Sequence, residues 1–208
     1  MPLPQAGRMT HAHDPFDRAY WEDRYGAPGL TWTGQPNAVL VDEAADLAPG
    51  RALDIGSGEG GDALWLAAKG WAVTGVDISQ NALDKARGRA EDVGLTVTWE
   101  QHDLTEWTPE PQSFDLVTAH FMHLADPARS ALFRALAAAV APVGTLLIVG
   151  HDVTGHDEHR EHMADLMFGV DDVLAAVDGE GLTVEIAESR VRAGGELRDI
   201  VVRATRAA

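Results

Sequence analysis

The residues best suited to chemistry lie in a glycine-rich segment, residues 53–61, with the sequence LDIGSGEGG. An apolar run over residues 51–55 precedes the glycines, and a helix-like apolar pattern over residues 62–69 follows them. The chain therefore passes from a predicted strand through a tight turn into a helix. Glycine lets the backbone approach a ligand closely, and the unpaired N–H groups that open a helix favour a negative group. The segment predicts a ligand-binding turn.

Two kinds of ligand fit these glycines. Gly56, Gly58 and Gly61 satisfy the G-x-G-x-x-G pattern of dinucleotide-binding turns. A second pattern, D-x-G-x-G-x-G, begins at Asp54 and ends at Gly60. Both patterns require an acidic residue after the next strand, where it accepts hydrogen bonds from ribose hydroxyls. Read alone, the turn is compatible with a nicotinamide dinucleotide and with another adenosine-type ligand.

Acidic residues after the predicted strands narrow the choice. Asp77 follows Gly56 by 21 residues, near the spacing of about 20 expected for the ribose-binding acid. Asp54 stands where the cationic amino group of a methionine moiety requires a carboxylate. Asp103, just beyond the third predicted strand, is placed to meet an adenine amino group. These positions favour a ligand that carries both adenosine and methionine.

Strands and helices alternate around these residues, and apolar periodicity and capping residues predict their bounds. Strands are expected at residues 51–55, 72–76, 96–100, 114–119, 145–149, 182–188 and 199–204. Helices are expected at 14–25, 37–47, 62–69, 80–92 and from the Asp126-Pro127 cap to residue 141, where Pro142 and Gly144 end the last of them. This alternation predicts a parallel, doubly wound sheet with right-handed crossovers. A turn around Gly194-Gly195 makes the last two strands an antiparallel pair.

Over residues 51–204 the chain resembles the class I S-adenosylmethionine-dependent methyltransferases. The segments that carry the resemblance are residues 53–60, 73–79, 101–103, 114–117 and 142–146. The resemblance implies an α/β, Rossmann-like, doubly wound seven-stranded sheet of order 3-2-1-4-5-7-6, with strand 7 antiparallel and helices on both sides, in a single domain. We expect residues 1–13 to be flexible, 14–50 to form a helical cap or lid, and 51–208 to form the core. Val143 departs from the family, many members of which have a glycine there.

The resemblance also implies a methyl donor, S-adenosyl-L-methionine, and a product, S-adenosyl-L-homocysteine. The glycines of the turn would face the methionine portion, Asp77 the ribose and Asp103 the adenine. The predicted cofactor-binding residues are Asp54, Gly56, Ser57, Gly58, Gly60, Asp77, Ile78, Asp103, Leu104 and His120.

A second resemblance concerns the acceptor. Residues 21–25 (WEDRY), Trp32 and residues 62–70 are similar to the thiopurine and tellurite-resistance branch of the family. That similarity implies a small soft nucleophile such as a thiol, a thiopurine or a chalcogen anion. Trp21, Tyr25 and Trp32 are then candidates for a lid whose rings face the sulfonium and the acceptor. Ordinary packing of an N-terminal helix explains them equally well.

Histidines supply the candidate general bases. His120 and His123 follow the fourth predicted strand, at the sheet edge where doubly wound folds bind ligands. Either could accept a proton from a hydroxyl or amine acceptor, or simply shape the pocket. Four more histidines, at positions 151, 156, 159 and 162, have a spacing that resembles a metal site. Because methyl transfer from a sulfonium requires no metal, we expect none and interpret this cluster as a solvated polar segment.

Composition restricts the partners. The 208 residues carry a formal charge of -17 without a compensating basic cluster, so nucleic acid is a poor substrate and a small molecule a better one. No apolar run spans a membrane, no signal peptide is evident and cysteine is absent, so we expect a cytoplasmic monomer or homodimer. The alternatives to a methyltransferase are a non-catalytic S-adenosylmethionine-binding protein and an NAD(P)-dependent oxidoreductase.

Overall fold

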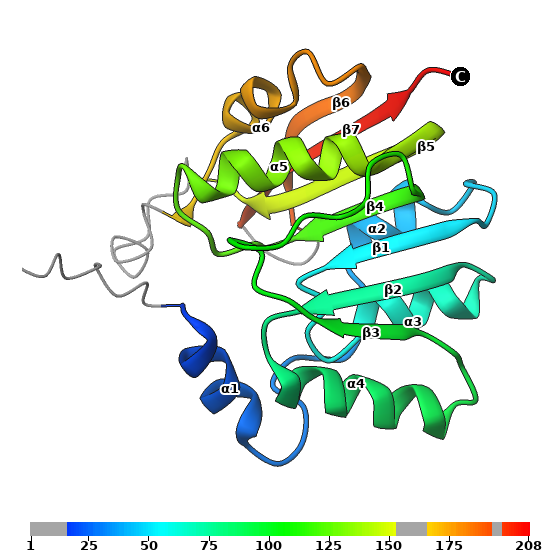
Figure 1. Ribbon diagram of the computed structural model, residues 1–208, viewed down its shortest axis with the longest axis vertical. Helices are drawn as coiled ribbons and strands as arrows, with labels where there is room; N and C mark the ends of the chain where they lie inside the picture. Colours follow the sequence, from blue (N-terminus) through cyan, green and yellow to red (C-terminus); the bar gives the residue numbers. More distant parts are fainter. Residues whose placement is uncertain (1–15, 153–165, 193–196) are drawn as a thin grey trace, which may run out of the picture.

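One seven-stranded sheet forms the centre of the molecule (Figure 1). The computed structural model describes residues 16–152, 166–192 and 197–208. The strands are β1 (Arg51–Ile55), β2 (Ala72–Asp77), β3 (Thr98–Gln101), β4 (Phe114–His120), β5 (Val140–His151), β6 (Leu182–Val191) and β7 (Arg198–Arg206). Their order is β3-β2-β1-β4-β5-β7-β6, in which β1 to β5 are parallel and β7 is antiparallel to both of its neighbours. This arrangement confirms the predicted fold class.

Helices cover both faces of the sheet. They are α1 (Arg18–Gly26), α2 (Ala38–Glu43), α3 (Gly61–Ala68), α4 (Gln80–Asp92), α5 (Ala128–Ala139) and α6 (Val170–Val177). Side chains of β5 alternate between two apolar clusters: Leu146 and Ile148 pack with α5 and α6, whereas Leu147 and Val149 pack with α2 and α3. A strand buried on both faces is apolar at every position, which is why its sequence reads as a continuous run.

Several helix bounds differ from the prediction. The expected cap at Asp14 lies outside the described residues, and Asp17 instead caps α1, accepting a hydrogen bond from the Tyr20 N–H at 2.9 Å. The prediction that a helix opens at Pro15 is therefore wrong, because residues 16 and 17 are not helical. Helix α2 is shorter than residues 37–47, and Asn37 caps it.

The start of β5 is the clearest correction. Pro142 and Gly144 do not end a helix, because α5 stops at Ala139 and both residues lie inside β5. The pairing register with β4 shifts between Phe114 and Leu116, so the proline segment forms an irregular start to the strand. Val143 adopts the left-handed backbone region with φ of 59° and is 72% exposed.

Helix α6 was not predicted. Its sequence contains apolar residues at helical spacing, and Asp171 and Asp172 lie in its first turn. Beside it the Phe168 ring packs on Phe133 of α5, with 5.2 Å between the ring centroids. The predicted turn at Gly194-Gly195 lies outside the described residues, although the antiparallel pairing of β6 with β7 is confirmed. In the part of the chain that the structure describes, no helix is long and apolar enough to cross a bilayer.

Candidate functional site

A cavity of about 1030 Å³ opens at the carboxyl ends of β1, β2 and β4. The parallel order of these strands brings their ends to one edge of the sheet, which is the usual ligand position in doubly wound folds. The predicted residues that line its wall are Trp21, Tyr25, Trp32, Asp54, Gly56, Ser57, Gly58, Asp77, Ile78, Asp103, Leu104, His120 and His123. Of the predicted set, all of it within the described residues, Gly60 is not part of the wall.

The glycine turn follows β1 and borders the cavity. Gly58 has φ of 51°, and a Cβ atom there would lie 3.1 Å from the Tyr25 hydroxyl oxygen. Gly60 has φ of 79°, but its missing Cβ would lie 2.8 Å from the Trp99 ring, inside the packing of α4 and β3. The two glycines therefore serve different purposes. Gly58 leaves room for the Tyr25 hydroxyl at the cavity wall, whereas Gly60 allows close packing behind the wall.

Asp77 is almost fully buried at the end of β2. Its carboxylate accepts hydrogen bonds from the backbone N–H groups of Gly58, at 2.8 Å, and Ser79, at 2.9 Å. Burial raises the pKa of Asp77, although these two N–H groups counteract the effect. Asp77 therefore holds the glycine turn against β2. Each oxygen keeps a further lone pair, so the carboxylate can still accept hydrogen bonds from ribose hydroxyls.

Asp54 carries an unsatisfied oxygen atom. Its side chain is 2% exposed at the end of β1, and one oxygen accepts a 2.9 Å hydrogen bond from the Thr118 hydroxyl. The other oxygen, Oδ2, has no hydrogen-bond partner among the described residues. Burial and the neighbouring carboxylate of Asp62 raise the pKa of Asp54 to about 7. A buried carboxylate oxygen without a partner costs stability, and a ligand ammonium group would remove that cost.

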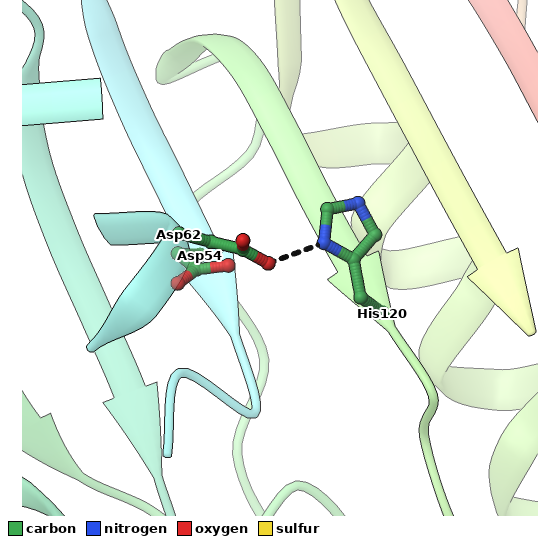
Figure 2. Close-up of side chains that lie close together, drawn as sticks. All are labelled: Asp54, Asp62 and His120. Atoms are coloured by element: carbon green, nitrogen blue, oxygen red, sulfur yellow. Dashed lines mark hydrogen bonds and ion pairs between the residues drawn. The ribbon is translucent and has the colours of Figure 1, made fainter. Parts of the chain in front are cut away.

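Beside Asp54 lies a hydrogen-bonded pair that the sequence did not reveal (Figure 2). Asp62 accepts a 2.7 Å hydrogen bond from Nδ1 of His120, and its other oxygen accepts one from the Asn37 N–H at 2.6 Å. Burial lowers the pKa of His120, but the charge of Asp62 and its hydrogen bond outweigh this effect and raise it. One ligand atom from each of Asp54, Asp62 and His120 lies within 4.8 Å of the others, a spacing that also suits a metal ion.

Asp103 lies in the turn after β3. Its Oδ1 accepts hydrogen bonds from the N–H and the hydroxyl of Thr105, at 2.9 and 2.7 Å. The neighbouring Trp107 ring stacks on His102 at 4.6 Å and stiffens this turn. The predicted cofactor-binding residues Asp103 and Leu104 thus lie together on the cavity wall.

Aromatic side chains from the N-terminal segment line the cavity beside the glycine turn. Trp32 donates a 2.9 Å hydrogen bond from its indole N–H to the hydroxyl of Tyr25, which is 6% exposed. The Trp21 ring stacks on Tyr25 at 5.8 Å and lies 5.5 Å from the His123 ring. Burial and the carboxylate of Asp77 raise the pKa of Tyr25 well above its usual value, so its hydroxyl stays protonated.

Two glutamates hold this segment over the site. The Glu22 carboxylate of α1 accepts hydrogen bonds from the N–H groups of Gln80 and Asn81, at 2.9 and 3.0 Å, and from the Ser79 hydroxyl at 2.8 Å. The Glu59 carboxylate, in the glycine turn, accepts hydrogen bonds from the N–H groups of Thr31 and Trp32. Sequence analysis singled out neither residue for this purpose, because each contact joins segments more than 25 residues apart.

The two candidate bases occupy different environments. His123 lies against the rings of Phe16 and Trp21. Burial, followed by the nearby His151, lowers the pKa of His123 to about 4. His123 is therefore neutral and a weak base near pH 7, whereas His120 is bound to a carboxylate. Of the histidine cluster, His151 lies at the end of β5, while His156, His159 and His162 fall outside the described residues.

Comparison with known proteins agrees with this geometry. The family model of a methyltransferase domain matches residues 52–144. The methyltransferase GfsG of Streptomyces halstedii is 32% identical over 157 residues, which are 73% of this chain and 56% of that protein. The chain spans about half the length of the curated relatives it matches.

Two solved structures extend the likeness to most of the chain. One, from work on the conversion of a disulfide bond into a thioacetal group during echinomycin biosynthesis, has a TM-score of 0.74 and 26% identity, and the match covers 95% of this chain and 92% of that one. The other is an S-adenosylmethionine-dependent methyltransferase from Mesorhizobium loti, with a TM-score of 0.66 and 21% identity, covering 82% of this chain and 99% of that one. None of these three proteins is named as a thiopurine or tellurite methyltransferase, so that branch stays a prediction. The family-model match, the methyltransferase relative, the sheet order of this chain and its likeness to these solved structures support a class I S-adenosylmethionine-dependent methyltransferase.

Proposed function

We propose that this protein transfers a methyl group from S-adenosylmethionine to a small-molecule acceptor. The observation that carries the proposal is the buried, unpartnered Oδ2 of Asp54 in the cavity wall. A dinucleotide offers no ammonium group to such an atom, whereas the methionine portion of the donor does. Asp77 lies on the same wall after β2, where we expect it to bind the ribose.

Three residues of this chain would each bind a different part of the donor. Asp54 would bind the amino group, Asp77 the ribose hydroxyls and Asp103 the adenine amino group, as the family resemblance implies. When bound, the donor supplies an activated methyl carbon: the acceptor's lone pair forms a bond to it while the carbon–sulfur bond breaks, leaving its electron pair on the sulfur of S-adenosylhomocysteine. The protein then contributes alignment and exclusion of water, and alignment alone can lower a barrier by about 7–11 kcal/mol.

The residues of the predicted cap segment would exclude that water. Of the predicted segment 14–50, the structure describes residues 16–50, and α1 places Trp21 and Tyr25 on the cavity wall. The Glu22 contacts hold α1 against the start of α4. We therefore assign the aromatic residues a lid role instead of packing alone.

The acceptor we favour is a soft nucleophile, a thiol in the first instance. The ring of His123 lies 5.5 Å from the Trp21 ring of the lid, and a group with a pKa of about 4 is a poor base for a hydroxyl or an amine. A thiolate reaches its reactive form without a strong base. The relative at 26% identity comes from work on a reaction at sulfur, which also supports this choice. His120, bound to Asp62 beside Asp54, would help to hold the donor rather than deprotonate the acceptor.

Calorimetric titration with S-adenosylmethionine, S-adenosylhomocysteine and NADH tests the donor. We expect micromolar binding of the two adenosyl ligands and none of NADH. Asp77→Ala should abolish this binding, whereas Asp84→Ala, on the exposed side of α4, should leave it unchanged. Binding of NADH alone would instead indicate an oxidoreductase.

A transfer assay separates an enzyme from a binding module. Radioactive methyl-labelled donor is incubated with a panel of small thiols, hydroxyls and amines, and labelled product is extracted. We expect label in a thiol fraction. Tight donor binding with no label in any fraction would make the protein a non-catalytic S-adenosylmethionine-binding protein.

A further inference from the structure

The cavity extends beyond β4 to a group of residues from the ends of β5, β6 and β7. His151 ends β5 and pairs in register with Asp199 of β7, and Arg192 follows β6 directly. All three line the cavity wall. Because the sheet order places β5, β7 and β6 on the far side of β4 from Asp77, this group faces the part of the cavity that the proposed function leaves to the acceptor.

Arg192 is held in a fixed position. Its Nε and Nη2 atoms donate to the two oxygens of Asp199, at 2.8 and 2.5 Å, and Asp199 is 4% exposed. The guanidinium carbon lies 5.1 Å from the centroid of the Phe121 ring. Such a paired and stacked guanidinium is pre-organised, and among the described residues its Nη1 has no hydrogen-bond partner.

The same arginine determines the proton position on His151. Nη2 of Arg192 lies 2.9 Å from Nδ1 of His151. Nδ1 also lies 3.5 Å from Oδ1 of Asp199, but the guanidinium is the nearer group and can only donate. In a neutral ring that accepts this hydrogen bond at Nδ1, the proton is on Nε2. The His151 ring packs on Phe121, with centroids 4.5 Å apart. His151 Nε2 is therefore a second hydrogen-bond donor beside Arg192.

Phe121 supports both residues from a strained backbone. Its φ of 53° lies in the left-handed region, which is unfavourable for a bulky residue, and its N–H donates to the Val149 carbonyl at 2.8 Å. Backbone strain of this kind is concentrated at ligand sites. Here the backbone conformation of Phe121 places its ring against both His151 and Arg192.

Charge is distributed unevenly along the cavity. Among the described residues, the arginines of its wall are Arg190 and Arg192 at the end of β6, where Arg190 pairs with Glu43 and Glu188 and Arg192 pairs with Asp199. The carboxylates of Asp54, Asp62 and Asp77 lie at the donor end. A negatively charged ligand group is therefore repelled less at the end of β6, where guanidinium groups balance the carboxylate charge, than at the donor end.

We infer that Arg192 and His151 form a binding site for a carboxylate of the methyl acceptor, so that the acceptor is a thiol acid. This inference rests on the proposed function for the thiol, but the carboxylate site itself stands on the two donors. A carboxylate offers two oxygens to Nη1 and Nε2, and hydrogen bonds to a charged partner are stronger than neutral ones.

Two test compounds of nearly equal shape isolate the carboxylate: 2-mercaptobenzoate and 2-methylbenzenethiol. Each is titrated by calorimetry into the unliganded protein and into the protein saturated with S-adenosylhomocysteine. We expect 2-mercaptobenzoate to bind at least about 10-fold more tightly in the wild type, the contribution typical of charge-assisted hydrogen bonds.

The matched variants are Arg192→Gln combined with Asp199→Asn, which replaces a buried ion pair by a neutral amide pair, and His151→Phe, which keeps ring stacking but removes the donor. Both should lose most of the preference for the carboxylate. The control, Arg198→Gln, alters an arginine bonded to Ser189 outside the cavity wall and should keep the preference in full. Equal melting temperatures in the three variants confirm that they fold.

The outcomes are distinguishable. If the wild type binds no S-adenosylhomocysteine, the proposed function fails, and the titrations of unliganded protein still test the carboxylate site. If the wild type binds both test compounds equally, or if the double variant keeps the preference, the carboxylate site is overturned while the methyl-donor site stands.

Discussion

At the scale of single residues, Asp54 combines a stability cost with a binding role. Its pKa is about 7 in the folded, unliganded protein and 3.8 in the unfolded chain, so between these pH values the folded protein holds a proton that the unfolded chain releases. Stability contributed by this proton is present below pH 3.8 and is lost as the pH rises to about 7. Donor binding requires the ionised carboxylate, so affinity should increase over the upper part of the same interval.

We therefore expect Asp54→Asn to have opposite effects on stability and binding. Without ligand at pH 8, the free energy of unfolding should increase by an amount on the order of 2–4 kcal/mol, because an uncompensated buried charge is removed. Affinity for S-adenosylhomocysteine should fall about 10–100-fold, and its rise between pH 6 and 8 should disappear. Differential scanning calorimetry and isothermal titration at the two pH values measure both effects.

Asp46→Asn, at an exposed position after α2, is the control for this experiment and should change neither quantity. Wild-type affinity in Asp54→Asn would show that the methionine amino group is bound elsewhere.

At the scale of elements, α1 is attached to α4 chiefly through one carboxylate. Burial raises the pKa of Glu22, but the N–H groups of Asn81 and Gln80 outweigh this effect and lower it. The attachment is therefore complete above pH 4.5 and weakens as the pH falls below that value. Glu22→Ala should raise the Kd for S-adenosylhomocysteine roughly 5–30-fold, the effect of losing about 1–2 kcal/mol of hydrogen bonding.

Hydrogen exchange locates that effect. Amide protons of α1 should exchange faster in Glu22→Ala, while those of β1 and β4 keep their wild-type rates. Asp23→Ala, which alters the exposed neighbour on the same helix, should leave both exchange and affinity unchanged. Unaltered protection of α1 in the Glu22 variant would mean that the aromatic contacts alone hold the helix.

A second prediction at the scale of elements concerns Val143, at the irregular start of β5. Val143 pays a conformational penalty in the left-handed region, about 1–2 kcal/mol, that glycine avoids at a smaller entropic loss. Val143→Gly should stabilise the protein by roughly 0.5–1 kcal/mol, visible as a rise in Tm of a few degrees. Val93→Gly tests the general effect of glycine: Val93 is 64% exposed with φ of -107°, so this variant should be neutral or destabilised. A lower Tm for Val143→Gly would contradict the strain argument.

At the scale of the whole molecule, the net charge governs how thermal stability depends on salt. A formal charge of -17 on 208 residues produces mutual repulsion that salt screens. Between about 10 and 150 mM NaCl the Debye length falls from roughly 30 to 8 Å, so we expect Tm to rise by several degrees. Thermal melts across that range measure the effect, and a Tm that falls with added salt would contradict it. The same charge predicts no binding to duplex DNA at 150 mM salt.

The amino-acid sequence alone determined the sheet and most residues of the proposed donor site. Strand and helix periodicity, the glycine turn and the acids at strand ends are local patterns, and parallel strand order then brings Asp54, Asp77 and Asp103 to one edge. Helix α6 and the start of β5 were missed or misassigned. In both places a local signal competes with sheet pairing or helix packing that joins distant parts of the chain.

The tertiary structure alone decided which side chains meet. The hydrogen bond between Asp62 and His120 joins residues 58 positions apart, and the contacts of Glu22 with α4 span a similar distance. The pairing of Arg192 with His151 depends on the register of β5, β7 and β6. Such contacts follow from the folded position of whole elements, and no periodicity or motif in the sequence encodes them. Burial lowers the pKa of both His123 and His120, and the contact with Asp62, which only folding creates, reverses this effect for His120.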